Sequence, residues 1–259
     1  MATSLTRVSI PLLVVVGLVV SVGLAVTPGS HSAHAAESSV GLGNAGSFAV
    51  LAASTVTNTG PTIVSGDLGV NAGSAVTGFP PGIVNSGAIH ATDTLSGLAQ
   101  NDLVTAYDDA AGRTPTASGL SALDGMTLVP GVYAGGALSL GGTLTLNGSA
   151  TDVFIFQATS TLDAGAGSHV LLTGGASACN VFWQVASSAV LHTGADFAGT
   201  IMALTSVSAD TGATITGRLM ARTGAVTLDT NVITRPTSCA TSAIGAPATP
   251  VPGHARFTG

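Results

Sequence analysis

Few residues in this sequence could carry acid–base or metal chemistry. Among 259 residues there are 12 Asp or Glu, six Lys or Arg and six His. His192 lies close in sequence to Asp196 and Asp210 and could form a catalytic dyad or a metal site, but a single histidine on a strand is more commonly a surface residue. Asp108 and Asp109 are adjacent in a predicted helix, so they point in different directions. We therefore expect no catalytic site, no metal and no cofactor.

Other enzyme and nucleic-acid signatures are also missing. Glu37 is the only glutamate, so a pair of catalytic carboxylates would have to come from scattered aspartates. No Gly-x-Ser-x-Gly nucleophile elbow occurs, and the glycine pairs at 135–136 and 141–142 lack the lysine of a phosphate-binding loop. The formal net charge of −6 argues against a nucleic-acid partner, because such a partner requires a basic surface.

The chemistry that does repeat is that of small and hydroxylated side chains. The segment Ala189–Asp196 aligns with Ser206–Thr214, and Ala225–Asn231 follows in the same register. Stacked strands bring equivalent residues about 4.8 Å apart, so threonines at matching positions would form ranks of methyl and hydroxyl groups on a flat, solvent-facing surface. A plainer interpretation is that threonine is simply a good strand residue on a solvated face.

The elements that must position these residues are also repeated. Four related apolar strands are predicted at Val153–Phe156, Val181–Val185, Ile201–Leu204 and Leu219–Ala221. The intervals from Val181 to Ile201 and from Ile201 to Leu219 are 20 and 18 residues, as in a solenoid whose coils cover one another. Because these strands are apolar on both sides, we expect the solenoid interior on one side and a helix on the other.

One convincing helix follows three short strands, which are predicted at Phe48–Val56, Thr62–Val70 and Ile83–His90. Thr92 or Asp93 can cap its start, apolar residues recur at helical spacing, and Gly112 occupies the position of a left-handed C-terminal residue. The predicted packing contacts of the helix are Leu98 and Leu103 against Phe154, Phe182 and Met202.

Both ends of the chain differ in composition from the middle. Residues 1–35 read as a signal peptide, with Arg7, an apolar run over Ile10–Val26 and a small-x-small cleavage site at Ala33–Ala35. The alternative is a membrane anchor, because the apolar run approaches the length that spans a bilayer. The proline-containing tail 241–259 shows no apolar periodicity and is predicted to be disordered, which leaves one β-helix domain over 36–240.

Export would place the chain in an oxidising compartment. Cys179 and Cys239 are its only two cysteines, so we expect them to form a disulfide. We also expect no membrane association once the signal peptide is cleaved.

Several motifs occur in an order that resembles a known family. They are Gly66–Val70, Gly78–Gly82, Val129–Tyr133, Asn180–Val185, Gly217–Ala221 and Gly224–Asp229. From about Leu42 to Pro236 the chain resembles the secreted microbial ice-binding proteins built on a single β-helix domain. The resemblance implies a mainly β fold: an irregular right-handed β-helix of triangular section with one long α-helix packed along it.

The resemblance also implies a function. A secreted, monomeric protein would adsorb to the ice crystal surface through a flat threonine-rich face and inhibit ice growth and recrystallisation. Such faces often carry a Thr-Ala/Gly-x-Thr/Asn pattern, which Thr211–Thr214 matches in full, Thr193–Asp196 matches except at its last position, and Thr230 matches only at the first. The predicted ice-binding residues are Thr193, Asp196, Thr211, Thr214 and Thr230.

Two other classes of function compete with ice binding. A cell-surface adhesin could use the same flat face to bind sugar or protein. A β-helix polysaccharide-degrading enzyme would need a groove lined by acids and a basic residue, for which Arg218, Arg222 and Arg235 are the available cations.

Overall fold

Parallel backbone hydrogen bonds stack the strands into coils in the computed structural model of this protein. The structure describes residues 37–239. The predicted signal peptide at 1–35 and the predicted tail at 241–259 therefore lie outside the described residues. The mainly β fold, with stacked parallel coils and one long helix, is confirmed.

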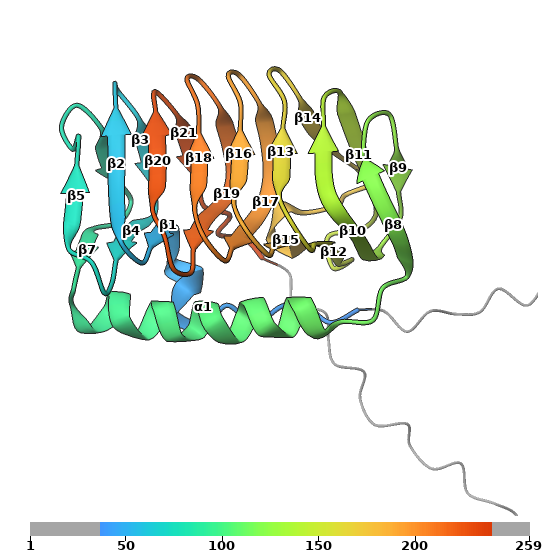
Figure 1. Cartoon of the computed structure of the whole chain (residues 1–259), viewed down its shortest axis with the longest axis horizontal. Helices are drawn as coiled ribbons and strands as arrows, with labels where there is room; N and C mark the ends of the chain where they lie inside the picture. Colours follow the sequence, from blue (N-terminus) through green and yellow to red (C-terminus); the bar gives the residue numbers. More distant parts are fainter. Residues whose placement is uncertain (1–36, 240–259) are drawn as a thin grey trace, which may run out of the picture. The chain divides into compact units, whose positions relative to one another are not determined.

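Each full coil contributes to three faces, which we call the helix-side, front and rear faces; Figure 1 looks onto the front face. The helix-side face contains β7 (Ile89–Ala91), β4 (Asp67–Val70), β1 (Phe48–Ala52), β19 (Thr214–Ala221), β17 (Asp196–Ala203), β15 (Val181–Val185), β12 (Phe154–Ala158), β10 (Gly131–Leu140) and β8 (Ala117–Ala122). The front face contains β5 (Ala75–Thr77), β2 (Thr55–Thr59), β20 (Val226–Asp229), β18 (Val207–Ala209), β16 (Ala189–Leu191), β13 (Leu162–Ala164) and the second halves of β10 and β8. The rear face contains β6 (Ile83–Asn85), β3 (Ile63–Ser65), β21 (Val232–Thr234), the first halves of β19 and β17, β14 (His169–Thr173), β11 (Thr143–Asn147) and β9 (Thr127–Leu128).

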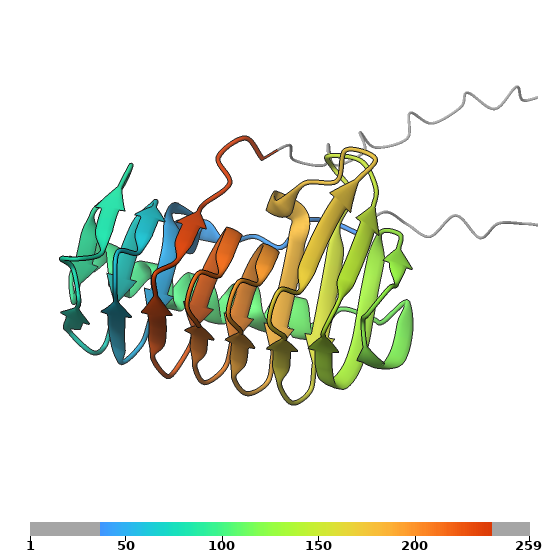
Figure 2. The same cartoon turned by 90° about the horizontal axis from the view of Figure 1, so that it is seen from above.

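The order of the coils in space differs from their order in sequence. The coil β1–β2–β3 pairs on one side with β4–β5–β6 and on the other with β19–β20–β21, so the last coil stacks on the first. The helix α1 (Thr94–Gly112) carries the chain from one end of the stack toward the other (Figure 1). Its 19 residues span roughly 28 Å at about 1.5 Å per residue, equivalent to about six strand spacings. Figure 2 shows the coils following one another in a single row.

The observed register corrects two sequence-based expectations. Trp183 pairs with Ile201, which pairs with Leu219, so both repeat intervals are 18 residues and the expected match of Val181 to Ile201 is wrong by two residues. The three strands predicted before the helix each bend at a corner, giving β1 and β2, β3 and β4, and β6 and β7. Short apolar runs do not reveal these corners, because the residues on both sides of a bend are equally buried.

Aromatic rings stack inside the coils. Tyr133, Phe156 and Trp183 come from three successive strands of the helix-side face, with ring centroids 5.6 and 4.0 Å apart. Phe197 extends this ladder, and the indole N–H of Trp183 donates to the carbonyl of Ala198. The interior is thus filled by side chains that meet their counterparts on neighbouring coils.

The helix covers the other side of the same strands. Asp93 caps it by accepting from the backbone N–H of Ser96, a contact that together with His90 lowers the pKa of Asp93 to about 2. A second apolar cluster joins the helix to Phe182 and Met202, as predicted. Its buried apolar helix residues are Ala99, Leu103, Ala106, Tyr107 and Ala110.

Three details of the predicted helix are wrong. Leu98 is 47% exposed, because the buried stripe consists largely of small side chains that bring the helix close to the strands and leave Leu98 outside the contact. Phe154 points into the solenoid interior, and its neighbour Ile155 contacts the helix cluster instead. Gly112 is the last helical residue and does not have a positive φ, since the chain becomes extended at Arg113.

We predict that Leu103→Ala lowers the free energy of unfolding by about 2–4 kcal/mol, because it removes a fully buried side chain from the helix contact. The matched variant Leu98→Ala should change it by less than about 0.5 kcal/mol, as for an exposed position. Urea denaturation of both variants measures the difference. Equal losses would contradict the observed docking of the helix.

The predicted disulfide is confirmed. Cys179, in the short 3-10 helix η2 (Ala178–Asn180), is bonded to Cys239, with Cα atoms 5.4 Å apart and 60 residues between them in sequence. Among the helices of residues 37–239, none is long and apolar enough to cross a bilayer.

Replacing both cysteines by alanine should destabilise the protein by up to about 4 kcal/mol, the loop entropy that a cross-link of this length removes from the unfolded chain. The measurement is the urea midpoint of the double variant against the oxidised parent. An unchanged midpoint would show that the cross-link does not contribute to the stability of the folded coils.

Candidate functional site

The front face carries two parallel columns of outward side chains. Along each strand, outward residues alternate with inward ones such as Val226 and Leu228, which belong to the interior core. The central column, in coil order, is Thr77, Thr57, Thr227, Ser208, Val190, Asp163, Ser139 and Ala122. The lateral column, two residues earlier on each strand, is Ala75, Thr55, Ala225, Ser206, Ser188, Thr161 and Ala137.

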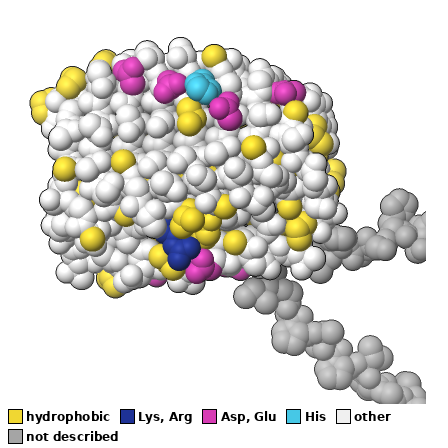
Figure 3. All heavy atoms as spheres, viewed as in Figure 1, with side chains coloured by type: hydrophobic (Ala, Val, Ile, Leu, Met, Phe, Trp, Pro, Cys, Tyr) yellow, Lys and Arg dark blue, Asp and Glu magenta, His cyan; other side chains and the backbone are white. Residues whose placement is uncertain are grey.

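These columns form a regular grid of small groups. Neighbouring coils are about 4.8 Å apart, and residues two positions apart on a strand are separated by roughly 6.7 Å. Hydroxyl and methyl groups occupy nearly all grid points, and the broad middle of this face bears no charged side chain (Figure 3). Charged side chains gather along its upper margin and near the helix. The front face is therefore an open, weakly polar surface.

Three of the sequence-predicted residues lie in the turns between the front and rear faces. Thr193 and Thr211 begin equivalent turns on neighbouring coils, each followed by a glycine with positive φ, 68° at Gly194 and 76° at Gly212. The N–H of Gly194 donates to the carbonyl of Thr211, and Thr230 occupies the corresponding turn of the next coil. The structure thus stacks these three threonines, at the margin of the front face.

Hydrogen bonds already occupy two of these hydroxyls. Both Thr211 and Thr230 donate their hydroxyl groups to the carboxylate of Asp229. A carboxylate is a strong acceptor that also orders its own water, so this margin differs chemically from the uncharged columns.

The other two predicted residues, Asp196 and Thr214, lie opposite each other on the rear face. Their column continues through Val232, Ile63 and Ile83 on one side and through His169 and Thr143 on the other. Asp196 forms an ion pair with His169, Nδ1 to Oδ2 3.0 Å. This column therefore mixes apolar, charged and hydroxyl groups.

His192 lies between two carboxylates at the margin of the front face. Its Nδ1 is 3.0 Å from Asp210, and its Nε2 is 3.3 Å from Asp163. The hydrogen bond to Asp163, followed by that to Asp210, raises the pKa of His192 above its ordinary value. Asp196, considered from sequence as a partner of His192, pairs with His169 instead. Within the described residues, no group of three or more His, Cys, Asp or Glu is arranged to hold a metal ion.

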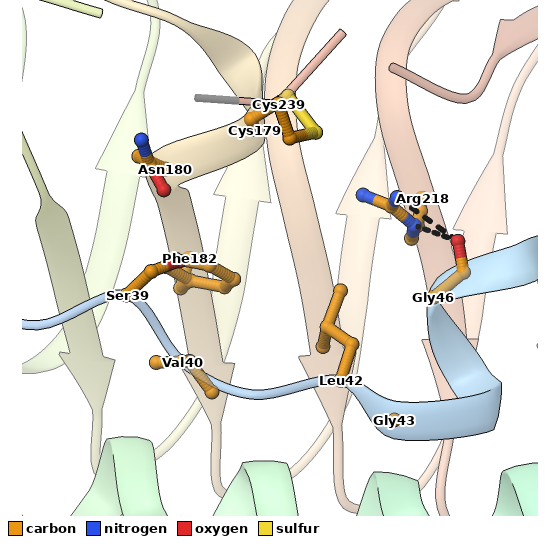
Figure 4. Close-up of a pocket in the computed structure, with 10 residues that line it drawn as sticks. All are labelled: Ser39, Val40, Leu42, Gly43, Gly46, Cys179, Asn180, Phe182, Arg218 and Cys239. Carbon is orange, nitrogen blue, oxygen red and sulfur yellow. Dashed lines mark hydrogen bonds between the residues drawn. A yellow bond between two sulfur atoms is a disulfide. The ribbon is translucent and has the colours of Figure 1, made fainter. Parts of the chain in front are cut away.

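A cavity of about 210 Å³ lies beside the disulfide, between the N-terminal segment and the helix-side strands (Figure 4). Arg218 lines it and donates to the carbonyl of Gly46 at 3.0 Å and to the hydroxyl of Thr200 at 3.3 Å. Burial lowers the pKa of Arg218 to about 10, so the guanidinium remains charged at neutral pH. The arginine fastens the N-terminal segment across these strands, and no carboxylate or histidine lines the cavity.

Sequence reasoning missed most of the front-face columns. Thr227 stood within an aligned segment, but Thr57 and Thr77 could not be matched to it. They become its neighbours because the first and last coils stack. The repeat of about 18–20 residues was the available signal, and it applies only to coils that are consecutive in sequence.

The stacked parallel coils and the front columns together define a β-solenoid protein whose candidate site is an open surface. A family description termed Ice-binding-like matches residues 50–234. An ice-binding protein of Nostoc sp. (strain HG1) is 46% identical over 198 residues, covering 74% of this chain and 72% of the relative. An ice-binding protein of Colwellia sp is 39% identical over 218 residues, covering 76% and 84%. This chain therefore belongs to the ice-binding-like family.

Solved structures agree with this assignment. The crystal structure of an ice binding protein from an Antarctic Biological Consortium has a TM-score of 0.76 and 43% identity, covering 78% of this chain and 93% of the other. The ice-binding protein from the Antarctic ascomycete Antarctomyces psychrotrophicus has a TM-score of 0.74 and 41% identity, covering 77% and 100%.

We predict that His192 titrates with a midpoint above about 6.5, the value of an unperturbed imidazole. Because its pKa is raised on folding, the stabilisation is present below the unfolded pKa and disappears as pH rises through the folded pKa. NMR of the ring protons, assigned with a His192→Gln variant, measures the midpoint. The double variant Asp163→Asn/Asp210→Asn should move it back toward the unperturbed value, and an unshifted midpoint in the parent would contradict the cluster.

Proposed function

We propose that this protein binds ice through its front face. The observation that carries the proposal is the pair of outward columns, in which hydroxyl and methyl groups repeat from coil to coil with almost no charge. The family membership supports it, because the compared relatives are named ice-binding proteins.

The grid suits a crystalline water surface. Methyl groups favour ordered hydration, and hydroxyl groups can fix that layer by donating and accepting hydrogen bonds. Each contact is weak, but repetition over several coils makes simultaneous release improbable, as in any multivalent attachment. A rigid, hydrogen-bonded stack presents these groups without first having to be ordered.

The front columns suit this role better than the five residues predicted from sequence. Thr211 and Thr230 donate to Asp229, and Asp196 is paired with His169, so these positions carry charge or already use their hydroxyls. We propose that Thr193, Thr211 and Thr230 form the margin of the ice-contacting surface and that Thr214 and Asp196 lie beyond it.

We further propose a secreted monomer with no catalytic activity. Secretion is supported by the signal-like sequence at 1–35 and by the disulfide between Cys179 and Cys239. A monomer is sufficient because one chain carries the whole front face. The adhesin alternative is not favoured, since the compared relatives are named for ice. A polysaccharide-degrading enzyme would need an acid-lined groove, whereas this surface is open.

Thr227→Tyr should abolish most ice shaping and thermal hysteresis, because a ring at the centre of the column lifts the surface away from the lattice. Thr57→Tyr, on the next coil, should act in the same way. Both residues are exposed, so stability should change by less than about 0.5 kcal/mol. The measurements are the shape of a single ice crystal, the hysteresis gap and circular dichroism.

A matched control is Thr105→Tyr, the same substitution on the exposed side of α1, which should leave ice activity intact. Thr211→Lys and Thr214→Tyr test the margin and the rear face, and we expect smaller losses there. If those two variants lost all activity while Thr227→Tyr kept it, the contact surface would be the turn and rear face.

A further inference from the structure

A single charged residue interrupts the two front columns. Every other member of the central and lateral columns is Thr, Ser, Ala or Val, whereas Asp163 stands in the central column between Val190 and Ser139. Its side chain is 56% exposed, so the carboxylate projects from the face and is not buried in it. Five coils precede this point, from Thr77 to Val190.

The position of the Asp163 carboxylate is determined by its neighbours. His192, on the adjoining coil, approaches Asp163 with Nε2 and Asp210 with Nδ1. Asp210 lies at the margin, one residue beyond the end of β18, and takes no part in either column. The imidazole therefore connects a carboxylate inside the grid to one outside it.

A carboxylate in this position opposes contact with ice. Its bound water is oriented by the charge, and removing a charged group from water without a full set of partners is strongly unfavourable. The lattice would have to accommodate that hydration shell or lose contact around it. Ser139 and Ala122, on the far side, would then be separated from the longer part of the column.

We propose that Asp163 limits the ice-contacting surface to the five coils from β5 to β16, and that removing its charge extends that surface across β13 to β10 and β8. This proposal rests on ice binding by the front face. It identifies Asp163 as the residue that determines how much of that face is used.

The test is Asp163→Ser, which makes this position match Ser139 and Ser208 in the same column. Thermal hysteresis at equal protein concentration should rise roughly 1.5-fold or more if activity follows the number of contacting coils. The matched control is Asp210→Ser, which removes the other carboxylate of the same histidine from outside the columns and should produce no rise.

A second variant separates charge from shape. Asp163→Asn keeps the size of the side chain and can still hydrogen-bond to His192, so the fold is preserved while the charge is lost. It should raise hysteresis in the same direction, with circular dichroism and melting unchanged. Unchanged or reduced hysteresis in both folded variants, or an equal rise in Asp210→Ser, would overturn the proposal. An inactive parent protein would instead contradict ice binding itself.

Discussion

Register between neighbouring coils is the constraint on which the rest of this structure depends. Parallel backbone hydrogen bonds place each residue directly against its counterpart one coil away, so an inward side chain must fit the inward side chains above and below it. The stacked rings of Tyr133, Phe156 and Trp183 show the consequence in the interior. Because inward and outward positions alternate, the same register also arranges the outward residues into columns.

The three faces differ because their outward sides are covered differently. On the helix-side face, large outward residues such as Phe182 and Met202 need cover, which α1 and the N-terminal segment provide. The helix can approach closely because alanines dominate its buried stripe. On the front face the outward residues are small or hydroxylated, so no cover is required and a flat surface remains available. One sequence pattern thus explains both the covered face and the open one.

Charge is arranged around that open surface. Asp229 and the cluster of Asp163, His192 and Asp210 occupy the turns or the neighbouring column positions, where carboxylates satisfy hydroxyl and imidazole donors. Exposed ion pairs of this kind contribute little to folding stability. Their stronger effect is on the water beside the front face, which connects the local electrostatics of the turns to adsorption on ice.

Much of this protein could be predicted from sequence alone. Local patterns are sufficient for a stacked β fold, for the helix capped by Asp93 and for the pairing of the only two cysteines, because alternation, helical spacing and cysteine number are properties of short segments or of composition. Leu98, Phe154 and the match of Val181 to Ile201 were misassigned, since hydrophobicity does not say which side a residue faces. Only the tertiary structure decided that the last coil stacks on the first. That contact joins Thr57 and Thr77 to Thr227, about 150 residues away in sequence, and so completes the front columns. No local signal encodes it, because an open strand edge can pair with any edge of matching register.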